Sequence, residues 1–214
     1  MKLKSEYIKL NSNKRLYQLP VPILGLTGGI ATGKSTVAEL FENEMIPVIN
    51  ADLLVKDIYA QTEAYEFILN NFKKAIINKK IDFQVLRTIA FTNDESKTII
   101  EEFIYERLPL SFMNAYEKFK DPELIVYDVP LLFEKKLDQL VDLSVCVYSP
   151  KETQLERLMR RDSIERELAE KIINTQLDIE DKKKSALFCI NNIASLQDLK
   201  INFSYFKEKV LFNN

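Results

Sequence analysis

The stretch ILGLTGGIATGKSTVAELF occupies residues 23–41 and carries the clearest structural pattern in the chain. It begins with a short apolar run of the kind that forms a buried strand, and glycines follow directly. From Lys34 onward apolar residues recur at helical spacing. They are Val37, Ala38, Leu40, Phe41 and Met45. All four glycines of the 214-residue chain fall within nine positions here, at 25, 28, 29 and 33. The stretch therefore predicts a strand, a glycine-rich loop and a helix in succession.

Residues 28–35 of this stretch, GGIATGKS, fit the phosphate-loop pattern G-x-x-x-x-G-K-[ST] without a mismatch. Glycines allow backbone N–H groups to point at phosphate oxygens, and the following helix adds the partial positive charge of its N-terminus. Lys34 is expected to bind the β- and γ-phosphates of a nucleotide, and the Ser35 hydroxyl to bind Mg²⁺. A chance glycine-rich turn would lack the flanking strand and helix. The predicted nucleotide-binding residues are Gly28, Gly29, Ile30, Ala31, Thr32, Gly33, Lys34, Ser35 and Thr36.

The rest of the chain continues the alternation of strands and helices. Apolar runs predict further strands at about residues 46–49, 124–128, 143–148 and 187–190. Helical patterns open at Asp52, fill the charged segment 151–184 and resume at about Ser195, whereas residues 62–120 show helical periodicity and no strand candidate. The predicted fold class is α/β. It is a P-loop NTPase fold with three layers around a parallel sheet, a helical acceptor-binding insertion and a helical lid.

These patterns divide the chain into segments with different expected roles. Residues 1–20 form a polar N-terminal leader, and residues 62–120 form the helical insertion that is expected to bind an acceptor. Residues 151–185, with their bunched arginines, form the expected lid. The predicted P-loop core comprises residues 21–61, 121–150 and 186–214.

Composition excludes several classes of site. The chain has no histidine and only two cysteines, Cys146 and Cys189, which stand in apolar runs and are expected to be buried thiols. A structural zinc site and a histidine base are therefore excluded. The net charge of −2 gives no basic field for nucleic acid, and no run approaches the roughly 18 apolar residues that span a bilayer. The leader does not have the pattern of a signal peptide. We expect a cytoplasmic protein without nucleic-acid or membrane partners, and a monomer or weak homo-oligomer.

Two classes of phosphate-loop protein fit these patterns, a small-molecule kinase and a nucleotide switch or motor. A GTPase switch needs N-K-x-D, and the nearest segment, residues 78–81 (NKKI), lacks the aspartate. A kinase needs a group that orients the acceptor and cations that close over the phosphoryl group. Asp52, at the expected end of the second strand, fits the first need. The arginines at 157–166 fit the second, unless they line a solvated helix face. Asp128 ends a strand as a carboxylate for Mg²⁺ or as a cap of the next turn.

Several segments together resemble the dephospho-coenzyme A kinase family. Residues 23–41 are similar to the family's opening segment, and IPVINADLLVKDI (residues 46–58) is similar to its PVIDAD segment. Residues 128–134, DVPLLFE, match a family motif at all seven positions. The run from Gln154 to Asp162 resembles the lid pattern Q-L-x-R-x-x-x-R-D. Gln176, Ala186 and residues 190–192 continue the register, so the resemblance covers roughly residues 23–200.

The resemblance implies that MgATP phosphorylates the 3′-hydroxyl of dephospho-coenzyme A, with ATP and Mg²⁺ as cofactors. It implies that Asp52 is the base or orienter and that Lys34, Arg157 and Arg161 act on the phosphates. Ser35 and Asp128 would support the metal. The implied acceptor site is the helical insertion. Another nucleoside or nucleotide kinase is the alternative, as is a regulatory nucleotide-binding protein with weak turnover.

Four departures from the family pattern are visible in the sequence. Asn50 replaces the first aspartate of the motif D-A-D, and residues 105–106 (Tyr-Glu) stand where His-Pro is usual. Phe83 replaces an arginine, and Leu187 replaces an aspartate. These changes bear on acceptor fit and nucleotide preference more than on phosphoryl transfer.

Overall fold

The computed structural model describes residues 1–212, which form two compact units. The first unit combines Met1–Asn50 with the described residues from Phe119 onward, and the second is Ala51–Lys118. Residues 213–214, the last two of the predicted core segment 186–214, lie outside the described residues. The two units are described separately below.

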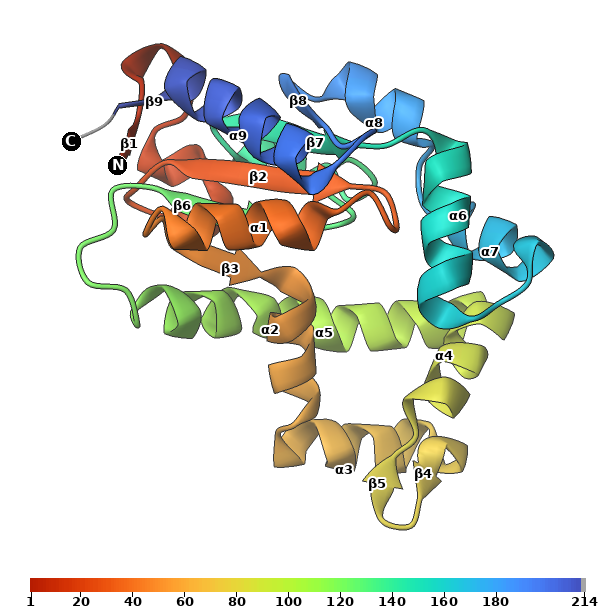
Figure 1. The fold of residues 1–214 in the computed structure, drawn as a ribbon. Coiled ribbons are helices and arrows are strands. Elements are labelled where there is room, and N and C mark those ends of the chain that lie inside the picture. The colour runs from red at the N-terminus through yellow and green to blue at the C-terminus, as the bar shows by residue number, and fades with distance from the viewer. Residues whose placement is uncertain (213–214) are drawn as a thin grey trace. The chain divides into compact units, whose positions relative to one another are not determined.

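A five-stranded parallel sheet forms the centre of the first unit (Figure 1). The strands in spatial order are β3 (Val48–Asn50), β6 (Ile125–Asp128), β2 (Ile23–Gly28), β7 (Leu143–Tyr148) and β8 (Phe188–Asn191). All six residues of the central strand β2 are buried, as expected where helices cover both faces of a parallel sheet. The sequence predicted each of these strands to within about two residues, because apolar runs bounded by turn residues mark buried strands.

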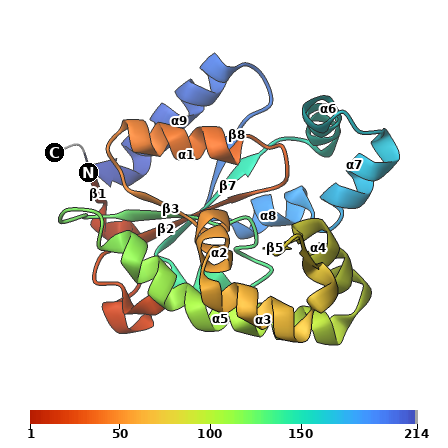
Figure 2. The ribbon, with the colours of Figure 1, turned by 90° about the horizontal axis from the view of Figure 1, so that it is seen from below.

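Helices flank this sheet, and two of them begin at its carboxyl edge. The flanking helices are α1 (Lys34–Asn43), α6 (Lys151–Asp162), α7 (Arg166–Ile173), α8 (Ile179–Ser185) and α9 (Leu196–Val210). Figure 2 shows α1 and α9 side by side on one face of the sheet. There Phe41 of α1 packs edge-on against Phe203 and Phe206 of α9. Since α1 and α6 directly follow β2 and β7, both helices begin at the carboxyl edge.

Met45 was wrongly included in the helical spacing that follows Lys34. Helix α1 ends at Asn43, and Met45 follows it with a positive φ of 59° and is 90% exposed. The expectation for the cysteines was half right. Cys146 is fully buried, and burial raises the pKa of its thiol to about 12, whereas Cys189 is only half-buried. Both are free thiols.

The N-terminal leader folds onto the first unit. Strand β1 (Lys2–Leu3) pairs with β9 (Leu211–Phe212), and the 3₁₀ turns that follow it span Ser5–Tyr7, Ser12–Lys14 and Leu16–Gln18. A further 3₁₀ turn, Leu137–Leu140, precedes β7. Arg15 reaches the buried carboxylate of Asp142, with its Nε 2.7 Å from Oδ2. Asp142 also accepts the backbone N–H groups of Lys9, Leu10 and Ile23. The Asp142 side chain therefore holds the N-terminal leader against the sheet.

The second unit is mainly helical. Its elements are α2 (Ala51–Tyr59), α3 (Thr62–Asn71), the 3₁₀ turn Lys73–Ala75, β4 (Ile76–Ile77), β5 (Lys80–Ile81), α4 (Phe83–Thr92) and α5 (Asp94–Tyr116). Stacked Phe67 and Phe103 lie in its apolar interior, with their ring centroids 4.0 Å apart. None of the helices within residues 1–212 is both long and apolar enough to span a membrane.

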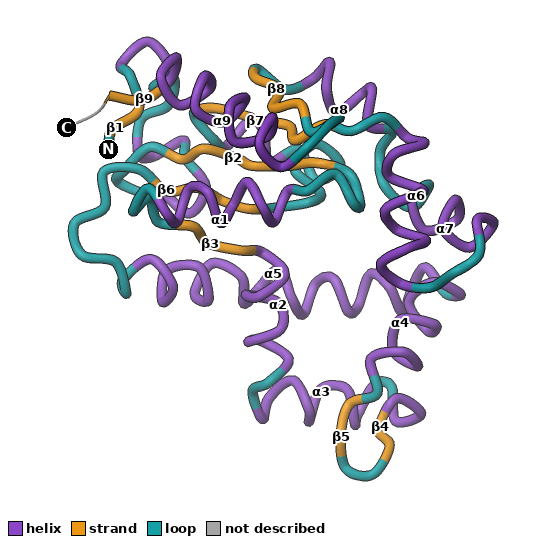
Figure 3. Tube along the Cα trace, in the orientation of Figure 1, coloured by secondary structure: helices purple, strands orange, loops and turns teal. Residues whose placement is uncertain are grey.

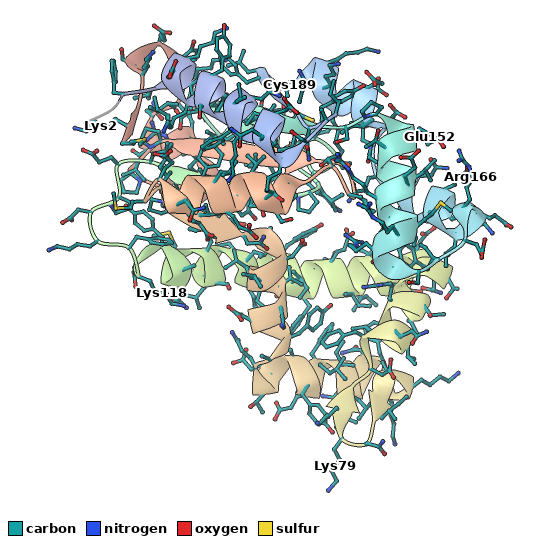
Figure 4. The ribbon with its side chains drawn as sticks, viewed as in Figure 1. Lys2, Lys79, Lys118, Glu152, Arg166 and Cys189 are labelled. Carbon is teal, nitrogen blue, oxygen red and sulfur yellow. The ribbon has the colours of Figure 1, made fainter. Side chains whose placement is uncertain are left out.

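Two expectations for this part of the chain were wrong. Residues 62–120 do contain strands, because β4 and β5 form a small hairpin (Figure 3). Its turn residues, Asn78 and Lys79, both have positive φ, as the type I′ hairpin turn requires. Figure 4 shows Lys79 at the tip of this hairpin. Asp52 does not end a strand. Strand β3 stops at Asn50, and Asp52 lies in the first turn of α2.

The Arg15–Asp142 contact gives a stability prediction. Arg15→Ala should lower the free energy of unfolding by about 3 kcal/mol, because it leaves a buried carboxylate without its cation. The adjacent Lys14 is exposed, so Lys14→Ala is the matched control and should change little. Urea denaturation of both variants checks this. Equal stability of the two variants would show that the leader is not held by Arg15.

Candidate functional site

The loop between β2 and α1 has the backbone geometry that phosphate binding requires. Gly33 takes a left-handed conformation with φ of 87° and caps the N-terminus of α1. A Cβ on Gly28 would lie 2.8 Å from the backbone oxygen of Val147, so only glycine allows this close approach of two strands. Lys34, Ser35 and Thr36 form the first turn of α1, where backbone N–H groups lack helical acceptors. The loop therefore offers free donors and a positive helix end to an anion.

Residues that follow β7 and β8 form hydrogen bonds with this loop and with each other. Thr32 is fully buried, and its hydroxyl donates to the Gly29 carbonyl at 2.8 Å. The Thr32 carbonyl accepts from Nδ2 of Asn192 at 2.8 Å, and the Ser149 hydroxyl donates to the Asn192 carbonyl at 2.6 Å. The sequence analysis assigned no role to Ser149 or Asn192. Their signal was available, because Ser149 directly follows the predicted strand 143–148 and Asn192 stands two residues after the predicted strand 187–190. Parallel sheets place their ligand-binding groups at such strand ends.

Lys34 and Asp128 join the phosphate loop to the end of the neighbouring strand β6. Their side chains form an ion pair in which Asp128 is 1% exposed and Lys34 is 14% exposed. The second carboxylate oxygen of Asp128 accepts Nδ2 of Asn50 at 2.7 Å. Two of the predicted site residues are thus in direct contact, and Asn50 is part of the same network.

The two predicted lid arginines lie on α6, and one of them, Arg157, contacts Ser149 and Asn192 beside the phosphate loop. Nη1 of Arg157 is 2.9 Å from the Ser149 hydroxyl, and Nη2 is 3.1 Å from the Asn192 carbonyl. Arg161 is exposed and forms two hydrogen bonds with the adjacent Asp162, at 2.7 and 2.9 Å. These bonds hold the pKa of the Asp162 carboxyl below its ordinary value, so the pair stays charged at neutral pH. The structure brings Arg157, but not Arg161, to the loop.

The segment 151–173 packs on the apolar part of the loop. Ile30 and Ala31 pack on a cluster that includes Leu155 and Leu158 of α6 and Ala169 of α7. Glu152 of α6 and Arg166 of α7 form two hydrogen bonds, at 2.5 and 2.9 Å, and Figure 4 shows both side chains at the outer side of these helices. A cavity of about 100 Å³ lies beside Gly29. Its lining also includes Gln154, Ile173, Gln176 and Leu177.

The oxygen groups near Lys34 suit a magnesium ion that arrives with a nucleotide. Ser35 is exposed at the start of α1 and offers a hydroxyl, and Asp128 offers a carboxylate. Within residues 1–212 no three His, Cys, Asp or Glu side chains gather as metal ligands. Mg²⁺ commonly takes one or two protein oxygens and completes its shell with water and phosphate. The residues present therefore fit Mg²⁺ that is bound together with a triphosphate.

The remaining predicted site residue, Asp52, belongs to the second unit. It is exposed in the first turn of α2, two residues after Asn50 along the chain. A carboxylate in the first turn of a helix interacts favourably with the helix dipole and can accept a hydrogen bond.

The ion pair at the loop predicts a stability effect that sequence alone did not indicate. Lys34→Met should lower the free energy of unfolding by about 3 kcal/mol, because Asp128 stays buried with its charge uncompensated. Lys34→Met combined with Asp128→Asn removes that charge and should recover most of the loss. Urea denaturation of the single and the double variant measures the loss and its recovery. If both unfold at the same denaturant concentration, the charge of Asp128 does not limit stability.

Comparisons with known proteins agree with this geometry. The family described as Dephospho-CoA kinase matches residues 22–198. A dephospho-CoA kinase of Fusobacterium nucleatum is 39% identical over 183 residues, which cover 85% of this chain and 94% of that protein. A solved structure from Thermus thermophilus has a TM-score of 0.82 at 26% identity, covering 90% of this chain and 99% of that one. Dephospho-CoA kinase from Campylobacter jejuni has a TM-score of 0.62 at 30% identity, covering 87% and 96%. This chain, with its phosphate loop and buried carboxylate, belongs to the dephospho-CoA kinase family of ATP-dependent P-loop kinases.

Proposed function

We propose that this protein transfers the γ-phosphoryl group of ATP to the 3′-hydroxyl of dephospho-coenzyme A, the last step of coenzyme A biosynthesis. The ion pair between Lys34 and Asp128 carries this proposal, because it joins the phosphate loop to the DVPLLFE segment. The first motif is shared by many nucleotide-binding proteins, whereas the second is more discriminating and agrees with the family that the chain matches over residues 22–198.

Phosphoryl transfer needs positioning and charge rather than covalent catalysis by the protein. In the proposed reaction the loop N–H groups and Lys34 bind the β- and γ-phosphates, and the α1 N-terminus adds positive potential. Ser35 and Asp128 would hold Mg²⁺, which supplies further positive charge to the phosphate oxygens. Lys34 is already beside Asp128, so its ammonium is held near the loop by a fixed partner.

The arginines of α6 have different proposed roles. Arg157 donates hydrogen bonds to Ser149 and Asn192, which keep its guanidinium group beside the phosphate loop. Among residues 1–212, Arg161 forms hydrogen bonds only with the exposed side chain of Asp162. An exposed ion pair of this kind costs little to break, so Arg161 is free to exchange Asp162 for phosphate oxygens when the lid closes.

Asp52 is the proposed acceptor of the hydroxyl proton. It would orient the 3′-hydroxyl toward the γ-phosphorus and take its proton late, as the corresponding aspartates of kinases do. The second unit, with its apolar interior between α3, α4 and α5, is the proposed binding region for the rest of the acceptor. We further propose a cytoplasmic monomer or weak homo-oligomer. Its two free thiols fit a reducing compartment, and light scattering would measure the assembly.

The experiment that tests the function measures ADP release from MgATP with dephospho-coenzyme A, adenosine, AMP or CMP as acceptor. We expect stimulation by dephospho-coenzyme A alone, with a product phosphorylated at the 3′ position. Stimulation by another acceptor would keep the kinase and discard the proposed substrate. Slow hydrolysis that no acceptor changes would support a regulatory nucleotide-binding protein instead.

The role of Asp52 gives a separate prediction. Asp52→Asn should lower kcat by about 10²- to 10⁴-fold, because the acceptor hydroxyl loses its base while the amide keeps a similar shape. The matched control is Asp57→Asn, which changes an exposed carboxylate on the same helix α2 and should leave kcat unchanged. Circular dichroism confirms that both variants are folded. Near-normal turnover of Asp52→Asn would remove this residue from the mechanism.

A further inference from the structure

A fully buried lysine lies on α8, outside the groups assigned to the reaction. Lys182 begins a run of three lysines, and its side chain is 0% exposed. The side chain of Lys184, two residues later on the same helix, is 76% exposed. Burying an ammonium group is costly unless it is paired and hydrogen-bonded, so its partners must be accounted for.

Both partners of the Lys182 ammonium belong to the segment that follows β6. Its Nζ donates to the Pro130 carbonyl at 2.6 Å and lies 2.8 Å from Oε1 of Glu134. The Pro130 carbonyl also accepts the hydroxyl of Thr27 at 3.0 Å. Oε1 of Glu134 also accepts the backbone N–H of Leu177 at 3.0 Å.

These contacts join three parts of the site at one point. Thr27 lies two residues before Gly29 of the phosphate loop, and Pro130 lies two residues after Asp128. Leu177 stands in the segment that returns from α7 to α8 after the lid helices. Lys182 is therefore the link between the loop strand, the turn that carries Asp128 and the end of the lid.

The ion pair is poorly built for stability. Oε2 of Glu134 is buried and has no hydrogen-bond partner among the described residues. An unpaired buried oxygen opposes folding, and a buried ion pair of this kind is often no more stabilising than apolar residues of the same size. A charged pair that adds little stability, yet also contacts the Pro130 carbonyl and the Leu177 N–H at the site, indicates a geometric role.

We propose that Lys182 is a positioning residue for phosphoryl transfer. It holds the Pro130 carbonyl and Glu134 in place. Pro130 thereby keeps Asp128 facing Lys34, and Glu134 fixes the segment that connects α7 to α8. Lys182 has no exposed surface through which to touch a substrate, so it acts only through these neighbours. This proposal rests on the proposed kinase reaction.

The test separates positioning from stability with three variants. Lys182→Met leaves the Glu134 carboxylate without its cation and should lower both the melting temperature and kcat. Lys182→Met combined with Glu134→Leu removes both charges, so the melting temperature should return close to that of the wild type. Its kcat should remain about 100-fold low, because small displacements of catalytic groups cost about that much. Lys184→Met, an exposed change on the same helix, should match the wild type in both measurements.

The readouts are kcat, KM for ATP, the dissociation constant of ATP and the melting temperature. A low kcat in the double variant, with its melting temperature and ATP affinity restored, supports the positioning role. Recovery of kcat together with the melting temperature would overturn it, because Lys182 would then act through stability alone. A wild type that phosphorylates another acceptor, or only hydrolyses ATP, would refute the proposed substrate. The same variants compared in that reaction would still decide the role of Lys182.

Discussion

The ion pair of Lys34 and Asp128 is the contact on which the site depends. The two residues are 94 positions apart in sequence, and they meet because β2 and β6 are parallel neighbours whose carboxyl ends share one edge of the sheet. A buried carboxylate needs a cation, and the only glycine-rich loop of the chain supplies it from the first turn of α1. The same ammonium is suited to phosphate oxygens. In the proposed function, one side chain therefore serves both fold stability and nucleotide binding.

Asn50 changes the charge of this network without breaking its connections. An aspartate at this position would face Asp128 across 2.7 Å, and two carboxylates so close cannot both stay ionised without a cation between them. The amide of Asn50 instead donates a hydrogen bond to Asp128. The departure from the family pattern thus lowers the negative charge at the carboxyl edge and leaves Asp128 with two donors rather than one.

The core strands and the phosphate loop could be predicted from sequence, because short apolar runs and clustered glycines have few structural interpretations. The β4–β5 hairpin could not, since two-residue strands have no periodicity, although Asn78-Lys79 is a recognisable turn pair. Site residues that follow strands, such as Asp128, could be placed, whereas nothing in a run of three lysines marks Lys182 as the buried one. Asp142 was missed for a related reason. It directly precedes the apolar strand β7, and only the folded leader reveals its five hydrogen bonds.

The pairing of β1 with β9 has a practical consequence for engineering. Lys2 lies opposite Phe212, and Nζ of Lys4 donates to the carbonyls of Glu208 and Lys209 at 2.8 and 3.0 Å. Figure 1 shows the first and last described residues close together within the first unit. Adjacent ends are the geometry that circular permutation requires. A short linker could join them, and new ends opened at the tip of the Asn78-Lys79 turn would cut the chain far from the phosphate loop in sequence.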